Sequence, residues 1–246
     1  MRVVVRGVSF VYDGEATPAL SHLDLEIESG SVHAIVGPNG CGKTTLLRLI
    51  AGLAAPTEGR IDFLGDRNRP NLTAIVFEEP RLLPHWNVER NIAIGHEFAA
   101  TPPSLYSRIR DFYTQRVGLA GHRHHQPDQL SMGQQTMAGL GRALAHDSEV
   151  LLLDEPFAHL DTLQRTSLRS EFETHWQLAP GTVVLVTHDV DEAVVMSDRV
   201  SVMRPGPGPV LGTVEVGLPR PRSKVSPQDP GRLDAVAEVW RLLDTG

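Results

Sequence analysis

The stretch that most constrains the fold is a glycine-rich run at residues 37–45, Gly-Pro-Asn-Gly-Cys-Gly-Lys-Thr-Thr. Its spacing is that of a phosphate-binding loop, G-x-x-x-x-G-K-T. The largely apolar residues 31–36 predict a buried strand before the loop, and residues 46–50 predict an apolar helical face after it. A strand, a glycine loop and a helix start in this order place backbone N–H groups around a polyphosphate. We therefore predict a nucleotide-binding site here.

Each residue of this loop has an expected role in phosphate binding. The glycines let the backbone approach phosphate oxygens with no Cβ in the way. Lys43 is expected to reach the β and γ phosphates, and the hydroxyl of Thr44 to hold Mg²⁺. The sequence has two lysines, Lys43 and Lys224, and a compact ammonium suits a tight phosphate cradle better than a planar guanidinium. The residues expected to contact the polyphosphate are Gly37, Pro38, Asn39, Gly40, Cys41, Gly42, Lys43, Thr44 and Thr45.

Composition narrows the classes of function. A chain of 246 residues can bury a full core, and a net charge of −7 argues against a nucleic-acid partner, which would need a broad basic face. No run approaches the roughly 18 apolar residues of a membrane span, and the N-terminus lacks the apolar stretch of a secretory signal. The single cysteine, Cys41, suits a reducing compartment, and we interpret it as a small side chain that fits the loop rather than a redox switch. We expect a cytoplasmic chain that reaches a membrane only through a partner.

Strand-like segments flank a helical middle region. Apolar or alternating runs predict strands at 2–12, 20–28, 31–36, 60–64, 73–77, 150–153, 182–186, 199–203 and 210–216. Helical signals occupy 87–94, 104–117, 131–145, 162–178 and 234–243. The helix at 162–178 lies between two apolar strands, which makes a βαβ unit and predicts a parallel sheet. The proline-rich, charged stretch 220–230 predicts a surface linker.

Two carboxylates and a histidine follow apolar strands. At the carboxyl edge of a parallel sheet, Asp154 would face the Mg²⁺ held by Thr44. Glu155 would then lie beside the γ-phosphate, where it could orient and deprotonate a water. His188 follows the strand at 182–186 and could polarise the same phosphate, although a lone histidine is more often structural.

Two further motifs lie in the helical middle region. Ser131 predicts a helix N-cap whose exposed N–H groups could bind an anion, and alone it would be an ordinary cap. The run His122-Arg123-His124-His125 could suggest metal binding. Because no Cys or carboxylate stands at ligand spacing, we interpret this run as loop surface.

These motifs, in this order, resemble the ATP-binding cassette (ABC) family of transport ATPases over nearly the whole chain. The resemblance implies an α/β fold, a P-loop NTPase cassette that combines a RecA-like mixed sheet core, an antiparallel β lobe and an α-helical signature lobe. It implies a single domain over residues 1–246. Its expected parts are a nucleotide-binding core at about 1–80 and 146–218, a helical lobe at about 81–145 and a C-terminal tail helix at about 219–246.

The resemblance also assigns roles to residues. Tyr12 becomes the aromatic residue that stacks on adenine, residues 130–134 the signature motif and residues 158–161 the D-loop. In the family two cassettes dimerise head to tail, and the signature of one closes over the ATP held by the other. The resemblance therefore adds Tyr12, Ser131, Gly133, Gln134 and Asp161 to the ATP contacts, gives Mg²⁺ the ligands Thr44, Asp154 and Glu78, and gives catalysis to Glu155, His188 and Lys43.

A finer resemblance concerns the transported solute. Residues 76–84, Val-Phe-Glu-Glu-Pro-Arg-Leu-Leu-Pro, are similar to a stretch of importer cassettes for nitrate, sulfonates, taurine and related small solutes. The tail 219–222, with the helix that carries Trp240, is similar to the end of the same group. The implied protein is an ATP-hydrolysing subunit on the inner face of the cell membrane. Its partners would be integral-membrane permease subunits, a second cassette (identical or different), and indirectly a solute-binding protein.

Some residues depart from the family pattern. Glu78 replaces the Q-loop glutamine; it can still offer an oxygen but adds negative charge, and a solvated loop carboxylate is an equal reading. Met132 replaces the first glycine of the signature, and His159 stands where the D-loop usually has a small residue. We expect normal ATP binding with slow or partner-dependent hydrolysis, and faster turnover after Met132→Gly. The alternatives are a catalytically weak regulatory cassette paired with an active partner, and a soluble non-transport ABC ATPase.

Overall fold

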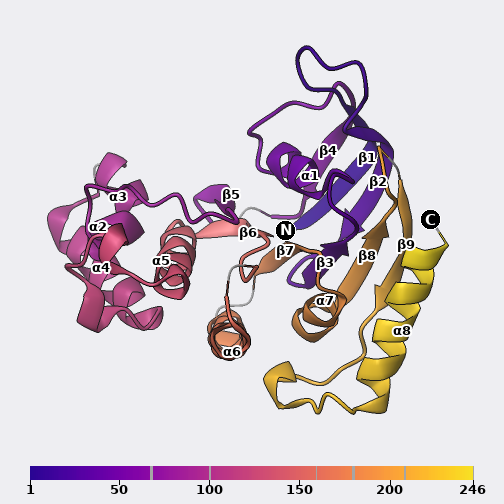
Figure 1. The fold of residues 1–246 in the computed structure, drawn as a ribbon. Helices are drawn as coiled ribbons and strands as arrows, with labels where there is room; N and C mark the ends of the chain where they lie inside the picture. Colours follow the sequence, from indigo (N-terminus) through magenta and orange to yellow (C-terminus); the bar gives the residue numbers. More distant parts are fainter. Residues whose placement is uncertain (67–68, 100, 159, 179–180, 208, 246) are drawn as a thin grey trace.

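A computed structural model of the chain describes residues 1–66, 69–99, 101–158, 160–178, 181–207 and 209–245, and two sheets organise it (Figure 1). The first sheet is antiparallel, with strand order β2-β1-β4. The second has the order β5-β6-β7-β3-β8-β9 and is parallel except for the pair β8–β9. The strands are β1 (Arg2–Phe10), β2 (Leu20–Ile27), β3 (Val32–Val36), β4 (Glu58–Leu64), β5 (Asn71–Val76), β6 (Ser148–Asp154), β7 (Thr182–Thr187), β8 (Arg199–Met203) and β9 (Val210–Glu215).

The predicted βαβ unit is confirmed. Helix α6 (Thr162–Leu178) connects β6 to β7, and these two strands pair in parallel with Leu152 opposite Val184. The antiparallel strand β9 at one edge makes the second sheet mixed, as predicted. A parallel sheet brings the carboxyl ends of its strands to one edge, so the residues that follow β3, β6 and β7 meet there.

Every residue of β6 and β7 is buried because both faces of the sheet are covered. Alternate side chains enter different cores. Val150 and Leu152 pack with helix α1 (Lys43–Ile50) and the three-stranded sheet. Leu151 and Leu153 pack in a second core with residues of α5 (Met132–Ala145), α6 and α7 (Val190–Met196). Helix α1 therefore lies between two apolar surfaces, which fixes the loop at its N-terminus.

A group of helices occupies the chain between β5 and β6 and stands to one side of the sheets in Figure 1. Asn87 begins this group as the N-cap of its first helix, accepting the Arg90 N–H at 3.0 Å. Its helices are α2 (Val88–Ile92), α3 (Ile94–Phe98), α4 (Pro103–Arg116) and α5 (Met132–Ala145). Later come α7 (Val190–Met196) and α8 (Pro230–Asp244). No helix in the described part of the chain has the length and apolarity to cross a membrane.

The prediction of a surface linker at 220–230 is wrong for Arg222. Its side chain is 3% exposed, and it donates to Asp198 Oδ1 at 2.8 Å and to the carbonyl oxygens of Ser197 and Leu218. A guanidinium has five N–H donors, and the several acceptors around it compensate for the cost of burying its charge. Helix α8 also begins at Pro230 rather than Asp234, because Asp229 caps it and proline suits its first position.

A buried ion pair joins α6 to α7. Arg169 Nη2 lies 2.7 Å from Glu192 Oε1, and the two side chains are 15% and 4% exposed. We expect Arg169→Leu to lower the free energy of unfolding by about 3 kcal/mol, because Glu192 then keeps a buried charge without its cation. Urea denaturation measures this. Arg241→Leu, at the exposed pair with Glu238, should lower it by less than about 0.5 kcal/mol. Equal losses would contradict the argument.

Candidate active site

The glycines of the phosphate loop stand where side chains do not fit. A Cβ on Gly37 would lie 2.8 Å from Cys41 Sγ and 2.9 Å from the Met203 carbonyl oxygen. Gly42 has a φ of 100° and caps α1, and a Cβ there would lie 2.5 Å from Leu20 Cδ2. The loop thus curls tightly between β3 and α1, and its glycines place no side chain between the backbone and the residues around it.

Lys43 is held inside this loop. Its side chain is buried, and Nζ donates to the carbonyl oxygens of Gly37 at 2.7 Å and Pro38 at 3.2 Å. The ammonium therefore lies inside the curl of the loop, held by two of its carbonyl groups. Cys41 is fully buried beside it, and burial raises the pKa of its thiol. A buried neutral thiol supports the interpretation of Cys41 as a small side chain that fits the loop.

Thr44 and Asp154 meet although 110 residues separate them. Thr44 Oγ1 donates to Asp154 Oδ1 at 2.9 Å. Burial raises the pKa of the Asp154 carboxyl; the Thr44 bond opposes this rise, while the nearby charges of Glu155 and Glu78 add to it. A hydroxyl and clustered carboxylates are the oxygen donors that Mg²⁺ takes in phosphate sites. The residues present therefore fit a divalent cation.

Glu155 and His188 form a second contact at the same sheet edge. Glu155 Oε2 lies 2.5 Å from His188 Nδ1, and their side chains are 15% and 56% exposed. The backbone of Glu155 has a φ of 45°, uncommon outside glycine, and its N–H donates to the Val186 carbonyl at 2.9 Å. This turn directly after β6 holds the carboxylate next to the residue that follows β7.

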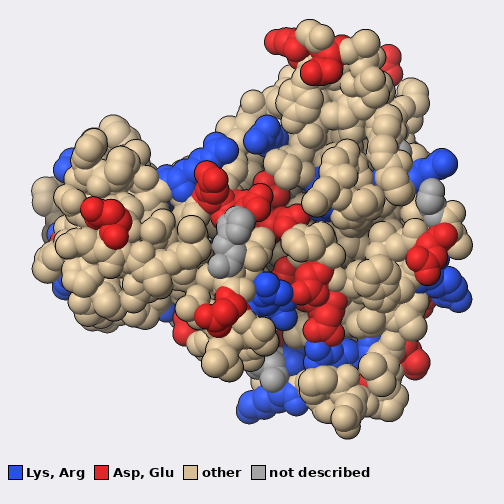
Figure 2. All heavy atoms as spheres, in the orientation of Figure 1, with Lys and Arg blue, Asp and Glu red and all other residues tan. Residues whose placement is uncertain are grey.

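Lys43, Thr44, Glu155 and His188 line one hollow of about 650 Å³, and Asp154 lies behind Thr44 without lining it. Besides the phosphate loop, its walls include Tyr12, Glu78, Glu155, Ala158 and His188. Tyr12 lies at the loop itself, with its hydroxyl 2.9 Å from Thr45 Oγ1. Glu78 is exposed yet lines the hollow. Figure 2 shows Asp and Glu side chains gathered near the middle of this face. A cation and a polyphosphate complement such a combination of carboxylates and N–H donors.

Other predicted site residues lie elsewhere in the chain. Ser131, Gly133 and Gln134 line a separate hollow of about 260 Å³ at the start of α5. Asp161 accepts the Gln164 N–H at 2.9 Å, so it caps α6, and it is not among the residues that line the larger hollow. His159 lies outside the described residues. Within one chain, therefore, the signature residues do not meet Lys43.

Comparison with known proteins identifies the family. Residues 20–158 match the family described as "ABC transporter". The chain is 42% identical over 207 residues to the aliphatic sulfonates import ATP-binding protein SsuB of Granulibacter bethesdensis, which covers 84% of this chain and 82% of the relative. This chain belongs to the ABC transporter family. The cassette is also 38% identical over 216 residues to the taurine import ATP-binding protein TauB of Escherichia coli, covering 87% and 85% of the two chains.

The fold agrees with this membership. The ATP-binding cassette MJ0796, solved as a dimer in a post-hydrolysis state with ADP and Pi, superposes with a TM-score of 0.76 at 26% identity. The match covers 87% of this chain and 98% of that one. The predicted ABC cassette fold, with an antiparallel β lobe and a largely parallel core sheet, is confirmed. This chain is an ATP-binding cassette of the ABC type.

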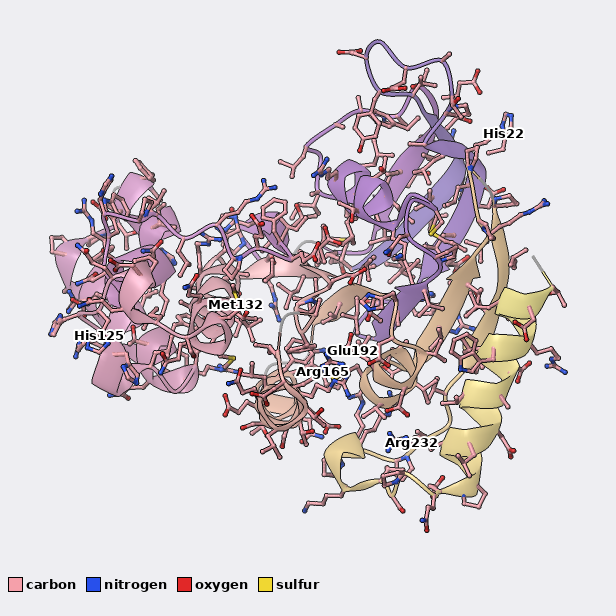
Figure 3. The ribbon with its side chains drawn as sticks, in the orientation of Figure 1. His22, His125, Met132, Arg165, Glu192 and Arg232 are labelled. Carbon is pink, nitrogen blue, oxygen red and sulfur yellow. The ribbon has the colours of Figure 1, made fainter. Side chains whose placement is uncertain are left out.

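Sequence reasoning missed two connections in this ABC cassette. Arg165 Nη1 donates to Asp189 Oδ2 at 3.1 Å, and its Nη2 donates to the Leu160 carbonyl at 3.3 Å. It thus joins the segment before α6 to the residue after His188. Figure 3 labels Arg165 on α6. The sequence carried a signal for this connection. Arg165 and Arg169 are four residues apart, so they share a face of the predicted helix and could meet acceptors on the same neighbouring element.

The second missed connection is His122, whose ring lies 3.0 Å from the side chain of Gln134. The loop-surface interpretation holds for His124, which is 74% exposed, but His122 and His125 are half-buried. No local pattern could have found this contact, since it depends on how the loop folds back onto α5.

Proposed function

We propose that this cassette hydrolyses ATP to energise an ABC importer for a small anionic or zwitterionic solute, such as a sulfonate, taurine or nitrate. The observation that carries the proposal is the identity of about 40% to the SsuB and TauB import ATPases over most of each chain. The cassette would act as a dimer docked on permease subunits at the inner face of the membrane, with a solute-binding protein as an indirect partner.

The larger hollow would hold ATP. Lys43 and the N–H groups of the loop would bind the phosphates, and Tyr12, at the rim beside Thr45, would stack on adenine. Glu155 would orient and deprotonate the attacking water, because its carboxylate is fixed beside the loop by His188 at 2.5 Å. His188 would then hold the γ-phosphate, since its ring can donate once it leaves Glu155.

Thr44 and Asp154, with Glu78 at the wall of the hollow, would hold Mg²⁺. When bound, the ion neutralises charge on the phosphate oxygens. The 2.9 Å contact between Thr44 and Asp154 supports this assignment, because two oxygen atoms that could coordinate the ion lie side by side. Burial is the main cause that raises the pKa of Asp154, and the nearby negative charges of Glu155 and Glu78 add to the rise.

The signature segment, residues 130–134, would complete the ATP site of a second cassette. Its residues are separated from Lys43 within the chain, and the MJ0796 cassette is a dimer. Asp161 would take part at the same interface. The division into a core at about 1–80 and 146–218, a helical lobe at about 81–145 and a tail helix at about 219–246 is part of this proposal. The slow turnover expected from Glu78 and Met132 finds no support in the comparisons.

Co-purification tests the transport assignment. The tagged chain would be isolated from its native membranes in mild detergent, and its partners identified. We expect a permease, with this chain as the only ATPase, and a solute-binding protein. A gene deletion should also remove growth on taurine or an alkanesulfonate as sole sulfur source, or on nitrate as sole nitrogen source, and the wild-type gene but not Lys43→Ala should restore it. Recovery with ribosomes or DNA, or a second cassette with an intact signature, would favour the alternatives.

Ser131 allows the dimer site to be tested separately from helix stability. Its hydroxyl caps α5, accepting the Gln134 N–H at 3.3 Å. Ser131→Ala should lower ATP turnover about 100-fold, the usual cost of one missing donor to a phosphate in the transition state. It should also lower the melting temperature. Ser131→Asp keeps a good N-cap but brings a negative charge. It should retain the melting temperature and still lose turnover; retained turnover would exclude a phosphate contact.

A further inference from the structure

A chain of side-chain hydrogen bonds joins the signature segment to a pair of histidines. Gln134 completes a capping box with Ser131, because its Oε1 accepts the Ser131 N–H at 3.0 Å. The other amide atom, Nε2, lies 3.0 Å from His122 Nε2. His122 Nδ1 lies in turn 3.0 Å from His125 Nδ1. The first turn of α5 is therefore held by the loop that precedes it (Figure 3 labels His125 and Met132).

Donors and acceptors in this chain follow from the backbone outward. A backbone N–H can only donate, so the Gln134 atom that faces it is oxygen and the atom that faces His122 is nitrogen. The amide nitrogen donates, so His122 Nε2 accepts and the proton of that ring is on Nδ1. This proton points to His125 Nδ1, which accepts and leaves the His125 proton on Nε2. Both rings are neutral in this arrangement.

The surroundings of the His122 and His125 rings allow either ring to take up a proton. His122 and His125 are half-buried, and their ring centroids are 4.9 Å apart. Arg123, between them in sequence, pairs with Glu89 and Asp111 rather than with either ring. The elements packed around this loop carry further charged or titratable groups. Glu171 of α6 lines the same hollow as His122, and Glu89 of α2 and Asp111 of α4 pair with Arg123 of the loop, where His124 also lies near Glu89.

We propose that His122 is a positioning residue for the ATP site that the signature segment completes across the cassette dimer, an inference that rests on the proposed function. Neutral His122 holds the Gln134 amide, and Gln134 fixes Ser131 through the capping box. An imidazolium donates from both nitrogens. When His122 is protonated, its Nε2–H and the amide N–H of Gln134 therefore face each other as two donors, and their hydrogen bond is lost. When His125 is protonated, its Nδ1–H in the same way faces the Nδ1–H of His122. Acidification therefore loosens the signature segment and lowers turnover.

Substitutions at His122 test the positioning role. His122→Gln offers an oxygen near the position of Nε2 and does not titrate, whereas His122→Leu removes the acceptor. At about pH 8, His122→Gln should keep kcat within about twofold of wild type, and His122→Leu should lower it about tenfold, the usual cost of leaving a half-buried donor unpaired. The KM for ATP should stay within about twofold in both, because the phosphate loop is untouched. His124→Gln, at an exposed neighbour in the same loop, is the matched control.

The pH profile separates positioning from a merely structural role. An imidazole ring can take up a proton as the assay is acidified, whereas a glutamine amide cannot. Between about pH 8 and pH 5.5, the kcat of wild type and of His124→Gln should fall at least about fivefold more than that of His122→Gln. Parallel profiles for wild type and His122→Gln would overturn the proposal, as would a His122→Leu variant with wild-type kcat.

A turnover-independent measurement keeps this inference distinct from the proposed function. Long-range proton–nitrogen NMR spectra of the full chain at about pH 8 report which ring nitrogen carries the proton. We expect the proton on Nδ1 in His122 and on Nε2 in His125. A proton on Nε2 of His122 would overturn the inference even in an active ATPase. Absence of ATPase activity in the wild type, with the expected tautomers, would instead count against the proposed function.

Discussion

Replacing Glu155 with glutamine is expected to lower ATP turnover at least about 100-fold while ATP binding is retained. Glutamine keeps the size of the side chain and can still hydrogen-bond to His188, but it cannot take a proton from water. The wild-type carboxylate is 15% exposed and lies 2.5 Å from His188 Nδ1, so it is already fixed at the wall of the hollow. The loss should therefore come from the chemical step rather than from a displaced loop.

Two measurements check this expectation. Single-turnover hydrolysis gives the rate of the chemical step, and size-exclusion chromatography with ATP shows whether the Glu155→Gln chain accumulates as an ATP-bound dimer. Glu79→Gln is the matched control, because Glu79 is an exposed carboxylate in the loop after β5 and should keep wild-type turnover. A Glu155→Gln variant that loses ATP binding together with turnover would show that the side chain supports the fold of the site instead of acting as the base.

Asp154→Asn is expected to have opposite effects on stability and on activity. The pKa of Asp154 is raised in the folded chain, chiefly by burial. The folded state therefore binds a proton at this carboxyl more tightly than the unfolded state does. It follows that ionised Asp154 lowers stability at neutral pH, and that this cost disappears as the pH falls through the folded-state pKa. Asparagine removes the charge, and its amide oxygen can still accept the hydrogen bond from the Thr44 hydroxyl.

Without nucleotide and metal, the Asp154→Asn chain should thus melt at a higher temperature than wild type at neutral pH. The melting temperatures of the two chains should converge as the pH is lowered. Its Mg²⁺-dependent ATP turnover should nevertheless fall about 100-fold or more, because a charged oxygen ligand is lost. Thermal melts in a chelator and Mg²⁺ titrations of turnover measure the two effects. Asp13→Asn, in an exposed turn, should change neither. A lower melting temperature at neutral pH would contradict the stability argument, and unchanged turnover would contradict the metal assignment.

The phosphate loop could be predicted from residues 37–45, because its geometry is local: glycine allows the turn and the helix that follows supplies the N–H groups. The meeting of Thr44 with Asp154, and of Glu155 with His188, could be expected from the rule that parallel strands end at one edge. The loop needed only a local pattern. The two contacts needed a local pattern in each segment and the rule that parallel strands end at one edge of a sheet.

Charged and polar residues with distant partners were beyond such reasoning. Arg222 reads as a surface residue in a proline-rich stretch, yet it is buried against Asp198 and two carbonyl groups. His122 reads as part of a loop, yet its ring contacts Gln134. Periodicity reports which face of an element is apolar, but it carries no information on which acceptor a distant donor will meet.

By itself, the sequence determined the nucleotide loop, the βαβ unit and membership of the ABC family, since each depends on short-range geometry or on motifs in a fixed order. Tertiary structure alone decided that His122 contacts Gln134 and that Arg222 is buried against Asp198. The physical reason is that the cost of burying a polar group depends on its partners. Those partners are brought together only when the whole chain has folded.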